Sequence, residues 1–287
     1  MDRAGCVTVS GVRVAMPQPF DFALTTERFA LFGHDPANVW AEGRLHRVLA
    51  GRETTIAPAP GGAEVAPPEA ELAEPVRRLL GAGFDLPAFA RFAAAADPVL
   101  ARLAAERPGL RPALVPDPWE ALVTAITAQQ VSLRAASAIR ARFVQAFGRR
   151  HERAWAFPTR DRVARETPDR LRALGFSNRK AEYAIALARA PLDLDALAAL
   201  PDHEVKAALT ALPGIGEWTA DWFLARHLGR PSAWPAGDLA LRKAVGAFYL
   251  DGRYPTIAET RAVGDRLGEH ANVAAHTLLA ALRRLPP

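Results

Sequence analysis

The spacing of hydrophobic residues changes at about residue 67. Before it, hydrophobic and β-branched residues alternate with polar ones in short runs separated by glycine and proline, which predicts a small antiparallel sheet with one or two helices. Beyond the proline-rich stretch 67–75, hydrophobic residues recur every three or four positions almost to the end of the chain, which predicts helices. The expected strands are 7–9, 12–14, a hairpin within 39–49, 54–57 and 63–65, with a break at 58–62.

We therefore expect a mainly α protein, with a small N-terminal antiparallel α+β domain over residues 1–74 and a helical region over residues 75–287. One helix start is well marked, with Asp117 as N-cap, Pro118 at the first helical position and Glu120 in the capping-box position. The other expected helices lie near 86–92, 99–103, 133–147, 161–166, 168–173, 179–188, 193–199 and 202–211, and from 273 onward.

The most distinctive stretch is 208–243. Two segments with helical spacing of hydrophobic residues flank the sequence LPGIG at residues 212–216. Pro213 ends the first segment, and the two glycines allow a tight turn. Gly216 lacks a Cβ, so a phosphate can approach the amides at the start of the second helix. The pattern predicts a helix–hairpin–helix motif, although a lone Gly-x-Gly just as often only ends a helix.

An acidic residue follows this hairpin. The loop 234–237 ends at Asp238, where a further amphipathic helix begins, so Asp238 suits the N-cap position. A carboxylate about 20 residues past a phosphate-binding hairpin also resembles the signature of the helix–hairpin–helix DNA glycosylase superfamily. In that superfamily a catalytic aspartate follows a loop rich in glycine and proline. The resemblance implies the glycosylase fold and a catalytic role for Asp238.

Further motifs are similar to the alkylpurine branch of that superfamily, 3-methyladenine DNA glycosylase II of the AlkA type. The resemblance is close over residues 112–250. It implies two helical subdomains, about 112–230 and 75–111 plus 231–287, with the active-site cleft between them. The motifs of that branch are Phe157–Thr159, Leu174–Phe176 and Arg179–Glu182. Ala128–Ser132 resembles the superfamily's segment that pushes into the DNA stack. Pro19–Leu24 resembles the start of the family's N-terminal domain, with an ordinary entry from strand to helix as the alternative.

The resemblance implies base excision repair of alkylated purines such as 3-methyladenine and 7-methylguanine. The transition state is close to an oxocarbenium ion, which a carboxylate of Asp238 near C1′ stabilises. Trp218 and Trp222 are expected to wall the pocket of the flipped base and to attract its positive charge by roughly 0.5–2 kcal/mol. The alternative is that both tryptophans belong to the core. Gln129 is expected at the pocket, where it holds backbone groups.

The resemblance also implies the DNA contacts. Gln130 is expected to fill the gap that the flipped base leaves, and the hairpin amides and the Thr219 hydroxyl to bind phosphate. A monovalent cation, sodium or potassium, is expected on the main-chain carbonyls of Thr210, Leu212 and Ile215, with no other cofactor. The expected DNA-binding residues are Gln130, Ser132, Arg179, Lys180, Pro213, Gly214, Ile215, Gly216 and Thr219.

Lysines are scarce, which bears on the reaction. The chain has only Lys180, Lys206 and Lys243. Relatives that also cut the strand use a lysine two residues after the second hairpin glycine, where this chain has Trp218. A Schiff base needs a neutral amine near C1′, so we expect a monofunctional enzyme that leaves an abasic site. The segment 269–272 also lacks the tryptophan that completes some alkylpurine pockets, which predicts a narrower or differently stacked pocket.

Charge favours a nucleic-acid partner. The net charge is +5, and residues 129–190 hold 14 Lys and Arg against 5 Asp and Glu, which suits a DNA backbone. Arginines that only solvate helix faces are the alternative. The single cysteine, Cys6, excludes the four-cysteine iron–sulfur cluster of some relatives.

The chain shows neither a signal peptide nor a run of roughly 18 apolar residues. We therefore expect a cytoplasmic protein, nucleoid-associated if bacterial, that works as a monomer on damaged double-stranded DNA and not at a membrane.

Two other interpretations stay open. An 8-oxoguanine glycosylase shares the fold and the N-terminal domain, although the absence of lysine at position 218 counts against its usual form. A non-catalytic DNA-binding module uses such a hairpin only as a phosphate anchor, but those modules are short and need no acid at position 238. The coupling of hairpin, loop and acid favours an enzyme.

Overall fold

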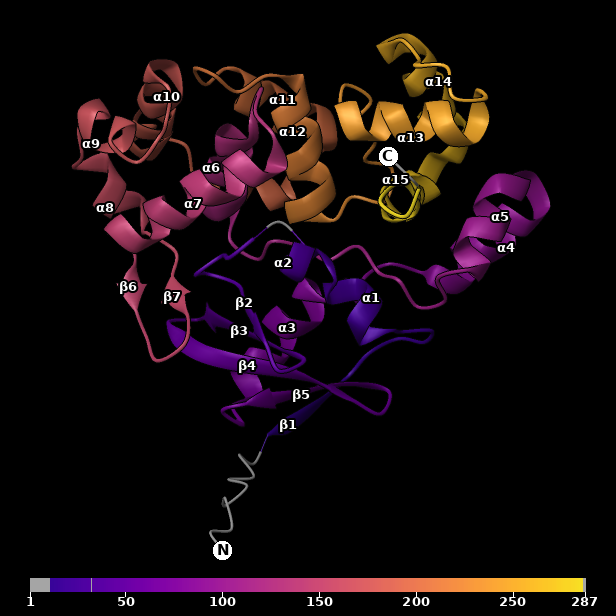
Figure 1. The fold of residues 1–287 in the computed structure, drawn as a ribbon, viewed down its shortest axis with the longest axis horizontal. Coiled ribbons are helices and arrows are strands. Elements are labelled where there is room, and N and C mark those ends of the chain that lie inside the picture. Colours follow the sequence, from indigo (N-terminus) through magenta and orange to yellow (C-terminus); the bar gives the residue numbers. More distant parts are fainter. Residues whose placement is uncertain (1–10, 32, 286–287) are drawn as a thin grey trace, which may run out of the picture.

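The computed structural model describes residues 11–31 and 33–285. A five-stranded antiparallel sheet with strand order β1-β5-β4-β3-β2 forms the N-terminal part, and helices form most of the rest, as Figure 1 shows. The expected strand at 7–9 lies outside the described residues. The prediction of a mainly α protein with a small antiparallel N-terminal α+β domain is confirmed.

The sheet is built from the predicted runs, with one difference in β4. Pro58 lies inside this strand opposite Ala63, and the turn is formed by Pro60 and Gly61 instead of the expected break at 58–62. Strand β3 pairs with β4 only as far as Ile56, so the missing amide hydrogen of Pro58 can face a side of β4 that has no partner strand. The strands are β1 (Val12–Ala15), β2 (Val39–Ala41), β3 (Arg44–Leu49), β4 (Arg52–Ala59) and β5 (Gly62–Ala66).

The boundary between the two hydrophobic cores lies later than the expected 74/75. Helix α3 (Ala73–Leu79) buries Val76 and Leu79 in the core beneath the sheet. This core extends to Leu80, and the helical core begins at Phe84. The expected boundary therefore falls inside a helix that the sheet needs to cover its hydrophobic face. The other short helices of this domain are α1 (Phe22–Thr26), α2 (Arg28–Leu31) and the 3-10 turn η1 (Ala70–Leu72).

Most helices begin and end within a few residues of the predicted bounds. The segment 193–199 is an exception: it holds a single 3-10 turn, because Asp193 accepts hydrogen bonds from the amides of Asp195 and Ala196 and turns the chain there. The last helix begins at 271 and not at 273.

The bounds of the helical region are as follows. They are α4 (Leu86–Ala96), α5 (Pro98–Ala105), α6 (Pro118–Ala128), α7 (Leu133–Phe147), α8 (Arg160–Ala164), α9 (Pro168–Arg172), α10 (Asn178–Arg189), η2 (Ala196–Ala199), α11 (Asp202–Thr210), α12 (Glu217–Phe223), η3 (Leu224–Leu228), α13 (Leu239–Tyr249), α14 (Ile257–Leu267), η4 (Gly268–His270) and α15 (Ala271–Leu282), with a small hairpin of β6 (Arg149–Arg150) and β7 (Trp155–Ala156).

Asp117 caps α6 as predicted, because its carboxylate accepts a hydrogen bond from the amide of Glu120. The capping box does not form. The Glu120 side chain turns inward instead, where its carboxylate lies 2.9 Å from a guanidinium nitrogen of Arg47 and 2.8 Å from one of Arg140. Two buried cations thus share one buried carboxylate.

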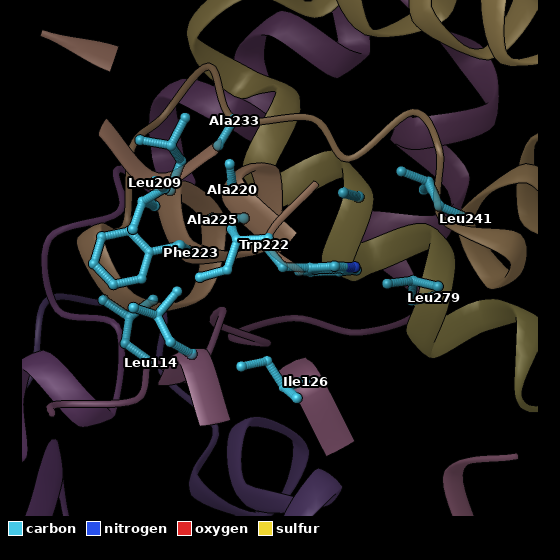
Figure 2. Packing of buried hydrophobic residues seen from close by; sticks show 14 of the residues in the cluster. Leu114, Ile126, Leu209, Ala220, Trp222, Phe223, Ala225, Ala233, Leu241 and Leu279 are labelled. Atoms are coloured by element: carbon cyan, nitrogen blue, oxygen red, sulfur yellow. The ribbon is translucent and has the colours of Figure 1, made fainter. Parts of the chain in front are cut away.

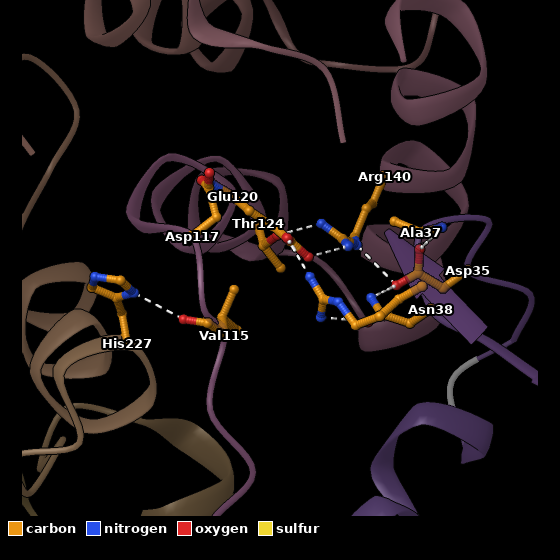
Figure 3. Close-up of polar contacts among 10 residues, drawn as sticks. Asp35, Ala37, Asn38, Val115, Asp117, Glu120, Thr124, Arg140 and His227 are labelled. Carbon is orange, nitrogen blue, oxygen red and sulfur yellow. Dashed lines mark hydrogen bonds and ion pairs between the residues drawn. The ribbon is translucent and has the colours of Figure 1, made fainter. Parts of the chain in front are cut away.

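This carboxylate belongs to a network that joins the N-terminal domain to α6 and α7 (Figure 3). Arg47 also donates to Asn38, and Arg140 also donates to Asp35. Burial by itself raises the pKa of Asp35, but Arg140 together with the hydrogen bonds from Asn38 and the amide of Ala37 holds it below its usual value. The network fixes the position of the sheet domain relative to the helices.

The helices form two groups, one containing α6–α12 and the other α4, α5 and α13–α15 (Figure 1). One hydrophobic cluster runs through both groups and includes Leu122, Trp222, Leu241 and Leu278. Between them, α12 continues into the π-helical turn η3, which ends at Gly229 with a φ of 67°. None of the helices in the described part combines the length and apolar character that a bilayer span needs.

Candidate active site

The predicted hairpin is present between α11 and α12. Gly214 has a φ of 78°, and a Cβ there would lie 2.1 Å from the ring of Tyr183 on α10. At Gly216 a Cβ would meet no atom within 4 Å. No hydrogen bond within the described residues engages the main-chain amides of Gly216 and Glu217. Gly214 therefore serves the fold, whereas Gly216 leaves open space beside free amides at a helix start.

Gln129 holds this hairpin from the end of α6. Its side-chain amide donates to the carbonyl of Gly214 at 2.9 Å and to the hydroxyl of Thr219 at 3.3 Å. It holds backbone groups as expected, but it does not line the cavity. Thr219 is 1% exposed, so the expectation that its hydroxyl binds phosphate is wrong. Its position, one residue after Trp218, turns it toward α6.

Asp238 lies where two hydrogen-bonding systems meet. One carboxylate oxygen, Oδ1, accepts from the amide of Leu241 at 2.9 Å and so caps α13. The other oxygen, Oδ2, accepts from the indole nitrogens of Trp218 at 2.9 Å and of Trp222 at 3.0 Å. The sequence did not indicate these indole bonds, although a buried tryptophan usually finds an acceptor for its N–H. Together the three donors fix the carboxylate in one orientation.

A cavity with a volume of about 330 Å³ opens in front of this carboxylate. This volume lies within the usual range for small-molecule sites, about 300–1,000 Å³. Trp218, Trp222 and Asp238 all line it. Figure 2 shows Trp222 packed among apolar side chains that include Leu241 and Leu279. The tryptophan is thus both a wall of the cavity and part of the hydrophobic core.

The cavity also contains cations that the sequence analysis missed. The guanidinium of Arg226 stacks on Trp222, with its central carbon 3.7 Å from the ring centroid, so this face of the ring is not available to a cationic base. Arg28 and Arg283 line the same cavity. Position 226 is four residues after Trp222 and eight after Trp218, and this helical spacing could have placed it on the same face.

Of the expected DNA-binding residues around the hairpin, some are exposed and others are buried. Gln130 is exposed with a φ of 52°, Ser132 caps α7 through the amide of Ala135, and Arg179 is exposed. Lys180 is buried, and its ammonium donates to the carbonyl of Thr127 at 3.0 Å. Burial also lowers its pKa. The assignment of Lys180 to the DNA surface is therefore wrong.

The hairpin also offers oxygen donors for a cation. Thr210, Leu212 and Ile215 lie at the end of α11 and in the following turn, where helix carbonyls lack helical partners. The carbonyl of Leu212 accepts from the amide of Ile215 at 3.2 Å and keeps a second lone pair.

Comparison with known proteins finds matches over the helical region. Residues 123–268 match the model of the HhH-GPD superfamily base excision DNA repair proteins. DNA-3-methyladenine glycosylase of Bacillus subtilis is 34% identical over 171 residues, 57% of this chain and 56% of the relative. DNA-3-methyladenine glycosylase 2 of Escherichia coli is 38% identical over 147 residues, 50% of each chain. This chain thus spans about half the length of the curated relatives it matches.

The fold extends further than these sequence matches. The structure of 3-methyladenine DNA glycosylase from Archaeoglobus fulgidus superposes with a TM-score of 0.86 at 27% identity, covering 95% of this chain and 98% of that one. The similarity in fold therefore extends beyond residues 123–268 and includes the N-terminal sheet domain.

Proposed function

The chain belongs to the HhH-GPD superfamily of base excision DNA repair proteins, and on this basis we propose that it is a monofunctional DNA glycosylase for alkylated purines. It flips the damaged base out of double-stranded DNA, hydrolyses the bond between base and sugar, and leaves an abasic site. The names of its relatives in Bacillus subtilis and Escherichia coli support 3-methyladenine as a substrate.

The observation that carries this proposal is the carboxylate of Asp238 at the cavity wall. Positive charge develops on the sugar as the bond to the base breaks, and a fixed anion beside C1′ stabilises it. The indole bonds from Trp218 and Trp222 hold Oδ2 in place before the reaction begins. The carboxylate therefore needs no reorganisation, and the attacking water can be oriented by the same group.

The flipped base occupies the cavity beyond Asp238, with Trp218 as one wall. The free amides at Gly216 and Glu217 bind a DNA phosphate, since a helix start attracts anions. Gln130, Ser132 and exposed arginines such as Arg179 contact the DNA nearby. A non-catalytic module needs neither the cavity nor the fixed carboxylate, so the enzyme is the stronger of the two proposals.

A sodium or potassium ion held by the carbonyls of Thr210, Leu212 and Ile215 supplies positive charge beside the bound phosphate. No organic cofactor is needed, because water is the only co-reactant of a hydrolysis. The protein acts as a monomer on cellular DNA, in the cytoplasm or nucleoid.

The lysines support hydrolysis without strand cleavage. Trp218 takes the position where a strand-cleaving relative has its lysine, and it is already bonded to Asp238. Lys180 is buried against Thr127, Lys206 pairs with Asp221 at 2.6 Å, and Lys243 is exposed. With the amines placed in this way, sodium borohydride should trap no protein–DNA adduct. A strong adduct that disappears in Lys243→Ala contradicts this part of the proposal.

The central test uses duplexes with a single 3-methyladenine, hypoxanthine or 8-oxoguanine lesion. The protein should remove at least one alkylated purine, and Asp238→Asn should abolish excision while keeping affinity for abasic-site DNA. Asp85→Asn is the matched control, because Asp85 also caps a helix through one amide, that of Ala88, but lies away from the cavity. Excision by Asp238→Asn within a few-fold of the wild type contradicts the proposal.

A further inference from the structure

Arg226 differs from the other arginines that line the cavity. Within the described residues, no hydrogen bond engages any nitrogen of its guanidinium, and its buried Nε, like those of Arg47 and Arg111, has no partner. A guanidinium has five donors and no acceptor, and a buried donor without a partner is costly. This arrangement indicates a ligand that supplies the acceptor. The other arginines of the cavity, each of which donates to at least one protein oxygen, are Arg28, Arg47, Arg111, Arg140 and Arg283.

The position of Arg226 relates it to the reaction centre. It lies in the π-helical turn η3, a form of helix often found at functional sites, and it stacks on Trp222. The indole nitrogen of the same Trp222 donates to Asp238. The guanidinium of Arg226 and the carboxylate of Asp238 therefore both contact Trp222 and both line the cavity. The described structure shows no salt bridge between these two groups.

The surroundings leave the charge of Arg226 uncompensated at short range. Burial lowers the pKa of Arg226 to about 10, while Asp238 raises it and Arg283 lowers it, so the group is charged at neutral pH. The neighbouring His276 stacks edge-on against Trp222 and donates from Nδ1 to the carbonyl of Asn272. Burial lowers the pKa of His276 to about 3. The histidine is therefore neutral and adds no charge.

We propose that Arg226 is a catalytic residue that stabilises the leaving base. Its N–H groups donate to acceptor atoms of the flipped base, on the side of the cavity away from the sugar. The bond between C1′ and the base nitrogen breaks, its electron pair passes to the base, and C1′ becomes an oxocarbenium ion beside Asp238. Water then adds to C1′ and releases a proton to solvent. This inference rests on the proposed glycosylase function.

The charge of the base falls by one unit in every such cleavage. A cationic N-alkylpurine becomes neutral, so Arg226 repels it when it binds. A neutral base with acceptor atoms, such as hypoxanthine, becomes an anion that Arg226 stabilises directly. Electrostatic groups aimed at developing charge are among the largest contributions to catalysis. Neutral, acceptor-bearing lesions should therefore depend on Arg226 most.

The test compares single-turnover excision of hypoxanthine and of 7-methylguanine from matched duplexes. Arg226→Met should slow hypoxanthine excision about 100-fold and change 7-methylguanine excision by less than about fivefold in either direction, and Arg226→Lys should recover part of the loss on hypoxanthine. In Arg226→Met the leaving base has no guanidinium to stabilise its negative charge and has to be protonated instead. Hypoxanthine excision by this variant should therefore accelerate about tenfold for each unit by which the pH is lowered. Arg242→Met is the matched control, because Arg242 stacks on Tyr254 outside the cavity.

The outcomes separate the two proposals. Equal loss on both lesions with an unchanged pH profile shows that Arg226 only supports Trp222, and overturns this inference. A wild-type protein that removes 7-methylguanine but not hypoxanthine also overturns it and leaves the glycosylase proposal standing. A wild-type protein that removes no lesion from either duplex or from 3-methyladenine DNA overturns both.

Discussion

Asp238→Asn is expected to reduce stability as well as activity. The carboxylate receives three donors, the amide of Leu241 on Oδ1 and the indoles of Trp218 and Trp222 on Oδ2. An asparagine amide has only one oxygen. This oxygen can accept hydrogen bonds either from the Leu241 amide or from the two indoles. In either orientation the NH₂ group of the asparagine faces the remaining donor and forms no hydrogen bond with it.

The less costly orientation can be estimated from these contacts. If the amide oxygen faces the indoles, the helix cap is lost, which costs about 1 kcal/mol. The two indole bonds also lose their charge assistance, about 1 kcal/mol each. Relief from burying a charge offsets part of this sum, so the expected loss is about 2–3 kcal/mol. This is less than the usual total of about 5–15 kcal/mol, so the variant should remain folded.

Urea unfolding with a constant m-value measures this loss. Asp85→Asn is the control, because Asp85 caps a helix through one amide and asparagine caps as well as aspartate. Its change should stay within about 0.5 kcal/mol. In a Trp222→Phe background the cost of Asp238→Asn should fall by about 1 kcal/mol, since one of the donors is gone. A cost below about 0.5 kcal/mol for Asp238→Asn, or strict additivity with Trp222→Phe, refutes the bonding described here.

Three further predictions concern binding, the domain junction and pH. Gly216→Ala should fold normally but bind all DNA duplexes more weakly, and to the same extent, in a binding titration. Gly214→Ala should instead be destabilised, because its Cβ would lie 2.1 Å from a tyrosine ring. If Gly216→Ala loses affinity for one lesion only, its proposed phosphate role is contradicted. Glu120→Gln should lose about 3–5 kcal/mol in urea unfolding, because buried Arg47 then has no carboxylate partner among the described residues and buried Arg140 keeps only Asp35, whereas Glu106→Gln on the exposed surface should lose far less. Burial lowers the pKa of His227 to about 4 in the folded protein, so as the pH falls this histidine is protonated in the unfolded chain before it is protonated in the folded one. The free energy of unfolding should therefore fall as the pH drops from about 6.5 to about 4, by at most about 1.4 kcal/mol per pH unit for this histidine. His227→Gln should flatten that slope, and an unchanged slope rules out this histidine as its source.

Local pattern was sufficient where a feature is encoded by neighbouring residues. The hairpin follows from two glycines between amphipathic segments, and the capping role of Asp238 follows from its place between a loop and a helix. The walls of the cavity follow from the four-residue spacing of Trp218 and Trp222. Each of these features depends on spacing within one or two helical turns.

Side-chain direction was harder to infer than position. Thr219 and Lys180 both belong to motifs near the hairpin, and both point into the protein instead of toward DNA. Successive residues of an α-helix point about 100° apart, so Thr219 cannot share the cavity face of Trp218. The same rule, applied to positions 218, 222 and 226, places Arg226 on that face. The position of this arginine therefore follows from helical spacing alone.

The closure of the cavity depends on contacts that no local pattern can indicate. Glu120 on α6 pairs with Arg47 on β3, 73 positions earlier in the chain. This pair and Arg140 bring Thr25 and Arg28 of the N-terminal domain to the cavity wall. A carboxylate at the start of a helix has an ordinary local explanation in a capping box, so its pairing across the domains was not expected. The hairpin and the loop after it place the carboxylate of Asp238, and the sheet domain supplies part of the wall of the cavity in front of it.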